Sequence, residues 1–171
     1  MSTLPITNFL KMIRQFKPSD LNPMREIYNH YVENTLLTFD EVALTETEFS
    51  DKLSPVLSKF PCMVYEKEGK VMGFAYATEW KENPAYRFTV SSSIYLDPEA
   101  MDKGTGTALY RKLIEELKEM KMHSIVAGIL MPNEKSTRMH ERLGFSKVAH
   151  LSQIGYKFNK WIDVSYWQMI L

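Results

Sequence analysis

The stretch from Thr89 to Leu113 has residue types that can hold a phosphate group. An apolar, β-branched run leads to Gly104 and Gly106, and a helical pattern with basic residues near its start follows directly. Glycines let the backbone come close to an anion, and the N–H groups and dipole of a helix's first turn favour its charge. Although G-x-G pairs occur by chance in many turns, the order of strand, glycine turn and helix predicts a phosphate cradle.

Asn133 and His140 are candidates for chemistry on a later helix. They lie seven positions apart, so both project from roughly the same helix face, two turns apart. An unperturbed imidazole titrates near ~6.5 and can donate or accept a proton. Asn133 is either a plain helix cap or a ligand contact, and His140 is either a proton-transfer group or a packed structural histidine. The sequence leaves both pairs of readings open.

Cys62 is the only cysteine in the chain, so there is no intrachain disulfide framework, and a reducing cytoplasm is expected. Its neighbours, PCMVYE, indicate an apolar strand, which favours a buried packing residue over a nucleophile. The four histidines are dispersed and have no cysteine partner pattern, so we expect no metal site.

The composition bounds the class of protein. The chain has 171 residues, of which 44% are hydrophobic and 25% charged, which is typical of a globular protein and argues against disorder. Its 21 basic and 21 acidic residues cancel, which disfavours a nucleic-acid partner. There is no apolar run of about eighteen residues, so no membrane span is expected. The N-terminus lacks a charged-then-apolar signal pattern, so secretion is not expected either.

Periodicity and turn signals predict a layered α+β fold. A T-x-x-E pattern at Thr45 and Glu48 is typical of a helix N-terminus, and the turn KEGK joins two strands in a hairpin. Gly144 is expected to end the helix that Asn133 begins. Strands are expected at 12–16, 62–66, 71–78, 87–96, 124–130, 145–150 and 164–170, and helices at 19–34 with Ser19 as N-cap, from Thr45 onward, at 104–120 and at 133–144. Antiparallel hairpins followed by a β-α-β unit indicate a mixed sheet.

Five segments resemble the GNAT N-acetyltransferase fold and, more narrowly, its phosphinothricin and methionine sulfoximine acetyltransferase branch. They are IYNHYVENTLLTF (27–39), YRFTVSSSIYL (86–96), MDKGTGTALY (101–110), MPNEKSTRMHERLGF (131–145) and GYKFNKWIDVSYWQ (155–168). The last is the most specific, because generic packing does not explain its pattern. The resemblance implies a single GNAT domain over 12–171, with a mixed, mostly antiparallel central sheet flanked by helices on both faces. Residues 1–11 have no clear periodicity and are expected to form a loose N-terminal arm before it.

The resemblance also implies acetyl-CoA as cosubstrate and indicates where it binds. The pantetheine arm would pair with the strand Ile94–Tyr95–Leu96 as an added strand does. Asn133 and, more weakly, Ser136 would contact the cofactor. The amides of the cradle would hold the pyrophosphate, and they belong to Asp102, Lys103, Gly104, Thr105, Gly106 and Thr107. Met101 departs from the arginine or glutamine that the family usually has there, which removes a hydrogen-bond donor.

Acetyl transfer to an amine needs few groups. The amine must lose a proton before it attacks the thioester, the oxyanion needs a backbone N–H, and the leaving thiolate takes a proton. In the resembling branch a glutamate in the motif T-V-E assists the amine, whereas here T-V-S places Ser91 there, and a serine hydroxyl cannot act as a base at neutral pH. Members of this branch often carry histidine at the position of His140. Whether Glu33, Glu41 or Asp163 reaches the amine is left open.

A small-molecule amine is expected to bind before the central strand. The resemblance places it against Pro84, Ala85, Tyr86 and Ser91, with Arg87 able to pair with a substrate carboxylate bidentately. In this branch two subunits commonly build a shared site, so the resemblance also implies a homodimer.

The sequence thus predicts an acetyl-CoA-dependent N-acetyltransferase that acts on the amine of a small amino acid or analogue by direct attack, without metal. Two alternatives remain. The acceptor is another amine, such as a polyamine or a protein N-terminus, an alternative kept open by the loss of the glutamate at Ser91. Alternatively, Met101 and Ser91 together indicate a weakly catalytic acyl-CoA-binding protein.

Overall fold

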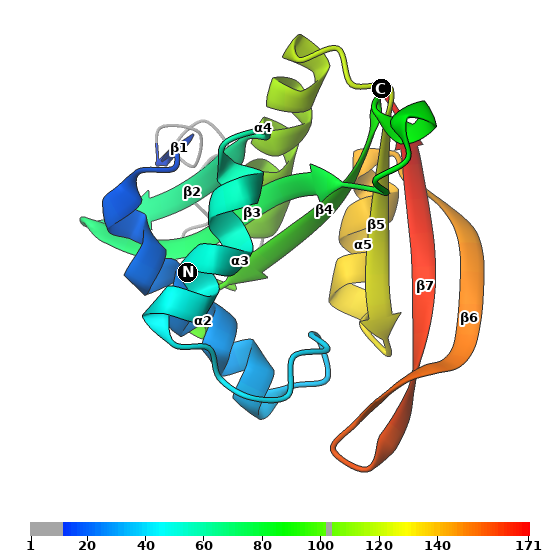
Figure 1. The fold of residues 1–171 in the computed structure, drawn as a ribbon, viewed down its shortest axis with the longest axis horizontal. Coiled ribbons are helices and arrows are strands. Elements are labelled where there is room, and N and C mark those ends of the chain that lie inside the picture. The colour runs from blue at the N-terminus through cyan, green and yellow to red at the C-terminus, as the bar shows by residue number, and fades with distance from the viewer. Residues whose placement is uncertain (1–11, 102–103) are drawn as a thin grey trace.

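The computed structural model describes residues 12–101 and 104–171, so the expected arm at 1–11 and the cradle residues Asp102 and Lys103 lie outside the described residues. Seven strands form one sheet in the order β1-β2-β3-β4-β5-β7-β6, and every neighbouring pair is antiparallel except β4 with β5 (Figure 1). The strands are β1 (Ile13–Gln15), β2 (Cys62–Lys67), β3 (Lys70–Glu79), β4 (Thr89–Leu96), β5 (Ser124–Met131), β6 (Ser146–Lys157) and β7 (Lys160–Ile170). This is the mixed, mostly antiparallel sheet that the sequence predicts.

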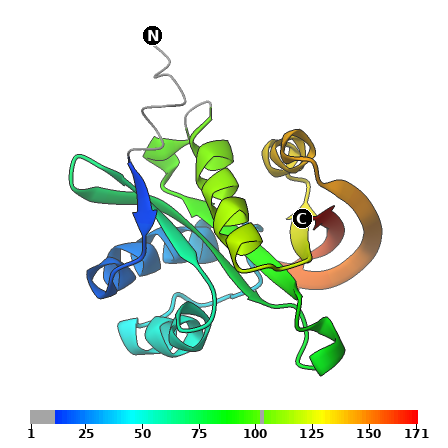
Figure 2. The same cartoon turned by 90° about the horizontal axis from the view of Figure 1, so that it is seen from above.

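Helices cover both faces of the sheet, as predicted. Seen from above, α2 (Leu21–Asn34) and α3 (Glu46–Leu57) lie on one side, and α4 (Thr105–Glu119) lies on the other (Figure 2). The helix α5 (Glu134–Leu143) packs beside α4. Each side has its own buried apolar cluster, one built on α2 and α3 and one built on α4. The sheet therefore separates two cores, which fixes the positions of β4 and β5 between them.

Local signals in the sequence account for most element ends. The Thr45 hydroxyl accepts the Glu48 N–H at 3.3 Å and the Glu48 carboxylate accepts the Thr45 N–H at 2.8 Å, so the predicted capping box begins α3. Gly144 ends α5 with φ +97°, a conformation that favours glycine. The expectation that Ser19 caps the first helix is wrong. Ser19 lies inside a 3₁₀ turn, Pro18–Asp20, and the Asp20 carboxylate instead accepts the Lys17 N–H at 2.7 Å.

The two central strands separate partway along their length. β4 and β5 pair in parallel only at Thr89 with Ser124, Val90 with Ile125, and Ser91 with Val126. Beyond these positions, residues 92–96 of β4 continue to pair with β3, whereas residues 127–131 of β5 pair with β7. The sheet therefore splits between its fourth and fifth strands, and we call the resulting opening the β4–β5 cleft.

Candidate functional site

The β4–β5 cleft opens into a cavity of about 740 Å³. Its walls are residues 92–96 of β4, residues 127–130 of β5, the first turn of α4 and one face of α5. Eight of the predicted cofactor-binding residues line it, namely Ile94, Tyr95, Leu96, Gly104, Gly106, Thr107, Asn133 and Ser136. Residues from four separate segments of the sequence thus meet at one opening.

The edge of β4 that faces the cleft offers backbone groups to a ligand. The N–H of Asp97 donates to Met72 on the β3 side at 2.9 Å, whereas the Leu96 carbonyl accepts the Tyr31 hydroxyl at 2.7 Å on the other side. Because backbone groups alternate along a strand, the N–H and C=O of Ile94 also point into the cleft. An extended, polar chain laid along this edge would find the hydrogen-bonding pattern of a neighbouring strand.

The start of α4 forms the predicted glycine turn. Gly104 has φ +117°, and the helix begins at Thr105 directly after it. A Cβ at Gly106 would lie 3.3 Å from both Leu96 Cδ1 and Met139 Sδ, so the position is tightly enclosed. The Thr105 hydroxyl is buried and has no hydrogen-bond partner among the described residues. A helix of fifteen residues therefore points its N-terminus at the glycine turn.

A chain of buried polar groups lies beside the cradle. His140 is 3% exposed, its Nδ1 lies 2.8 Å from the Ser136 carbonyl oxygen, and its Nε2 lies 3.3 Å from the Tyr110 hydroxyl. The Tyr110 hydroxyl makes a hydrogen bond with Ser92 Oγ. Burial lowers the pKa of His140, against the opposing effect of the Ser136 carbonyl, and burial raises the pKa of Tyr110. Both groups are therefore neutral at pH 7, and all three side chains line the cavity.

Asn133 does cap α5, because its side-chain oxygen accepts the Ser136 N–H at 3.1 Å. It also lines the cavity, together with Ser136. The cap explains the residue's place in the fold, and its cofactor contact stays a prediction.

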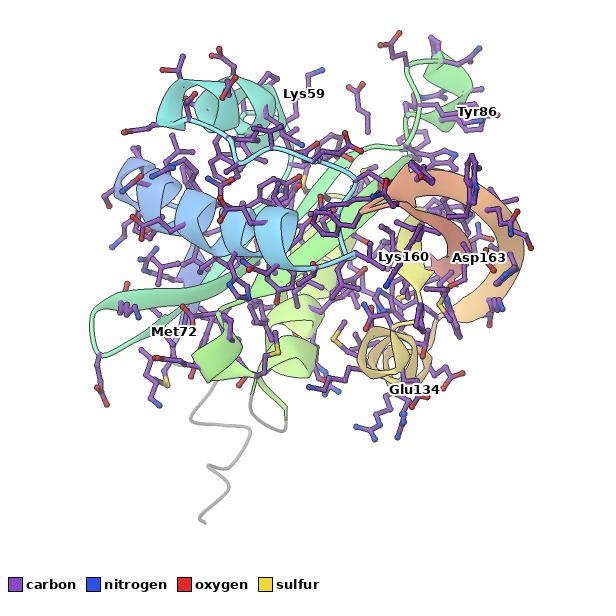
Figure 3. The ribbon with its side chains drawn as sticks, turned by 90° about the horizontal axis from the view of Figure 1, so that it is seen from below. Lys59, Met72, Tyr86, Glu134, Lys160 and Asp163 are labelled. Atoms are coloured by element: carbon purple, nitrogen blue, oxygen red, sulfur yellow. The ribbon has the colours of Figure 1, made fainter. Side chains whose placement is uncertain are left out.

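The predicted acceptor-binding residues do not line the cavity of the β4–β5 cleft. Pro84, Ala85 and Tyr86 form an exposed 3₁₀ turn, η2, which precedes β4 at the end away from the cradle, and Arg87 packs over the Phe88 ring at 4.7 Å. Figure 3 shows Tyr86 on η2 and Glu134 at the start of α5 on opposite sides of the molecule. Tyr86 instead lines a separate groove of about 500 Å³.

Ser91 occupies the last position at which β4 pairs with β5 and does not line the cavity. Its neighbour Ser92 turns its side chain toward Tyr110 on α4, so the alternation of a strand places Ser91 on the opposite face, which α2 and α3 cover. The structure therefore separates Ser91 from His140 across the sheet.

The remaining candidates do not reach the cavity. Glu33 and Glu41 are exposed, and none of the three candidate carboxylates lines it. Asp163 accepts the Gln153 N–H at 2.8 Å and pairs with His150 Nε2 at 2.8 Å, and both contacts lower its pKa. Its carboxylate is therefore occupied by contacts within the β6–β7 hairpin. Burial raises the pKa of Cys62 to about 12, so its thiol stays protonated and is a poor nucleophile.

Comparison with known proteins decides the family. Residues 13–166 match the family model described as an acetyltransferase (GNAT) domain. The chain belongs to the GNAT acetyltransferase family. It is 36% identical over 156 residues to a phosphinothricin N-acetyltransferase of Streptomyces viridochromogenes. The match covers 91% of this chain and 85% of the relative.

Two further similar proteins agree with this family. A methionine sulfoximine/methionine sulfone acetyltransferase of Salmonella typhimurium is 34% identical over 160 residues, 93% of this chain and 94% of the relative. The crystal structure of a GNAT phosphinothricin acetyltransferase from Sinorhizobium meliloti, in complex with AcCoA, superimposes with a TM-score of 0.90 at 33% identity and covers 93% of this chain and 87% of that one. The protein is an N-acetyltransferase.

The cleft of this acetyltransferase fits acetyl-CoA. The open edge at Ile94 suits an amide-bearing arm, and the α4 N-terminus with Gly104 and Gly106 on the cavity wall suits an anion. Met101 is half exposed at the cavity wall, where it offers no hydrogen-bond donor. Within residues 12–101 and 104–171, no group of three or more His, Cys, Asp or Glu is placed to hold a metal ion, and no described helix is long and apolar enough to cross a membrane.

Sequence reasoning did not single out Ser92 and Tyr110, whose hydroxyl groups lie on the cavity wall. Tyr110 is fully buried among the apolar residues of α4, where a tyrosine is expected to be core. Ser92 is the middle member of a serine run, SSS, and strand alternation gives it the opposite face from Ser91. The sequence offered one signal for this pair: strand alternation turns Ser92 toward the helix on whose core face Tyr110 lies.

Proposed function

We propose that this acetyltransferase uses acetyl-CoA to acetylate the amine of a small amino acid or analogue, of the phosphinothricin or methionine sulfoximine type. The observation that carries the proposal is the β4–β5 cleft, where an open strand edge, a glycine turn at a helix N-terminus and a buried imidazole line one cavity. Relatives with these named substrates match over nearly the whole chain. The chain from 12 to 171 acts as one catalytic domain.

Acetyl-CoA binds along the cleft. The strand Ile94–Tyr95–Leu96 pairs with its pantetheine arm, and the amides of residues 102–107 hold its pyrophosphate, with Gly106 leaving room for close approach. Asn133 and Ser136 contact it from α5. The support for these roles is that eight members of the set line the cavity.

The chemistry needs a proton acceptor for the amine and a proton donor for the thiolate. His140 lines the cavity, and burial lowers its pKa, so its neutral state suits it to accept a proton. A backbone N–H of β4 stabilises the oxyanion. Ser91 orients the acceptor from the opposite face of the strand.

In this proposal the acceptor-binding residues before β4 act only in a homodimer. Pro84, Ala85, Tyr86 and Arg87 lie far from the cavity of their own chain, so they serve an acceptor site only where two chains meet. The β6–β7 hairpin supports such an interface, because it exposes large apolar side chains that include Ile154 and Trp161. We place the protein in the cytoplasm, where its single buried thiol would stay reduced.

A thiol-release assay with acetyl-CoA and a panel of amines tests the function. Turnover with phosphinothricin or methionine sulfoximine is expected. Turnover limited to a polyamine or a peptide N-terminus would reassign the acceptor. Tight acetyl-CoA binding without turnover on any amine would overturn the enzymatic proposal in favour of an acyl-CoA-binding role.

A further inference from the structure

Ser92, Tyr110 and His140 form a hydrogen-bonded chain whose direction the structure assigns. The Ser136 carbonyl can only accept a hydrogen bond, and it lies 2.8 Å from His140 Nδ1, so Nδ1 carries the imidazole proton. In the neutral ring Nε2 then has a lone pair and accepts from the Tyr110 hydroxyl at 3.3 Å. The Tyr110 oxygen in turn accepts from Ser92 Oγ. Every hydroxyl proton therefore points toward His140.

The hydrogen-bonded chain runs along the cavity wall from Ser92 on β4 to the buried imidazole of His140 on α5. Ser92 lies on the β4 wall of the cleft. His140 packs edge-to-face on the Tyr110 and Phe145 rings, with centroids 5.0 Å away in each case. Tyr110 of α4 is the titratable side chain in direct contact with the imidazole, and β4 contributes only the Ser92 hydroxyl through it. No described charged side chain makes a hydrogen bond or ion pair with His140.

We propose that Ser92 and Tyr110 are a proton relay that connects the acceptor amine to His140, which stores the amine proton until the thiolate leaves. The proposal rests on the proposed acetyltransferase function and adds two residues and a direction to it. It also supplies the base that β4 lacks, because Ser91 stands where a carboxylate would otherwise act.

The relay balances the reaction. The step begins from the neutral amine, which has already lost its ammonium proton to solvent. As its nitrogen bonds to the thioester carbon, one N–H proton passes to Ser92 Oγ, the serine proton passes to the Tyr110 oxygen, and the tyrosine proton passes to His140 Nε2. As the carbon–sulfur bond breaks, the same shifts run in reverse and deliver the proton to the coenzyme sulfur. The products are an amide and a thiol, and His140 returns to its neutral form.

The surroundings of His140 suit a side chain that holds a proton only briefly. A buried imidazolium without a carboxylate partner is unfavourable, so His140 gives its proton up readily to a thiolate, whose ordinary pKa is near ~8.5. Tyr110 does not need to ionise, because its oxygen receives one proton as it releases another. The raised pKa of Tyr110 therefore does not prevent proton transfer through its oxygen.

Three variants test the relay: Tyr110→Phe, Ser92→Ala and His140→Gln. We expect Tyr110→Phe to lower kcat about 10-fold to 100-fold, within the ~10²–10⁴ range of general acid–base catalysis, while the acetyl-CoA dissociation constant by calorimetry changes less than about twofold. The wild-type kcat should fall on the acid side with an apparent pKa below ~6.5, and His140→Gln should remove that limb.

Matched controls separate the relay from fold damage. Tyr65→Phe removes a hydroxyl from another buried tyrosine of the α4 core, away from the cavity, and His123→Gln alters an exposed histidine. Both should keep wild-type kcat. If Tyr110→Phe melts like the wild type and keeps its kcat within twofold, the relay is wrong although the function stands. If the wild type acetylates no amine, the proposed function and the relay fail together.

Discussion

Replacing Gly106 by alanine tests whether the glycine turn at the start of α4 holds the pyrophosphate of acetyl-CoA. The added Cβ would lie 3.3 Å from Leu96 Cδ1 and from Met139 Sδ. Both neighbours are side-chain ends that can give by a few tenths of an ångström. The gain of about 0.5–1 kcal/mol from alanine in a helix offsets part of this crowding. The free energy of unfolding should therefore change by less than about 1 kcal/mol.

Acetyl-CoA affinity should fall far more than stability. The methyl group would stand where the backbone must approach the phosphates, and one lost hydrogen bond to a charged oxygen costs about 2 kcal/mol, which is roughly 30-fold in Kd. Titration calorimetry with acetyl-CoA measures the Kd, and thermal melting measures the fold. Glu119→Ala, at the exposed far end of the same helix, is the control. A folded Gly106→Ala variant that binds acetyl-CoA within twofold of the wild type would refute the cradle.

Three other predictions address separate features. Because burial lowers the pKa of His140, the unfolded chain binds more protons than the folded one just below the ordinary histidine pKa of ~6.5. The free energy of unfolding should therefore rise with pH through that window, and His140→Gln should flatten the rise in urea titrations at about pH 5 to 7. Met101→Arg should restore a donor at the cavity wall and tighten acetyl-CoA binding about fivefold, or about 1 kcal/mol, with Met101→Leu as control. Gly155→Ala would place a Cβ 2.1 Å from the Phe39 ring and should cost about 1–3 kcal/mol of stability as the ring is displaced, a loss that an unchanged melting temperature would contradict.

Elements that depend on local signals could be predicted from the sequence. The capping box at Thr45 and Glu48, the β2–β3 hairpin and the glycine that ends α5 each form through contacts within a few residues. β6 was predicted to end at His150 but extends to Lys157. Its second half is mostly exposed, so it lacks the alternation of a half-buried strand. Its length follows from pairing with β7, which a local pattern does not reveal.

The sequence predicted part of the cavity wall, where a motif and the backbone geometry coincide. The strand Ile94–Tyr95–Leu96, the glycine turn and Asn133 all meet at the cleft. Tyr110 could not be assigned, because its role depends on Ser92, 18 positions before it, and on His140, 30 positions after it. Such contacts arise only when α4 and α5 pack together on one face of the sheet.

The most direct test of the account is mass spectrometry of the products formed from acetyl-CoA and methionine sulfoximine by the wild-type protein. The account predicts that the amino acid gains one acetyl group on its α-amine, with one free coenzyme A released per product. A protein that binds acetyl-CoA tightly but yields no acetylated product from methionine sulfoximine, phosphinothricin or any other amine would contradict it.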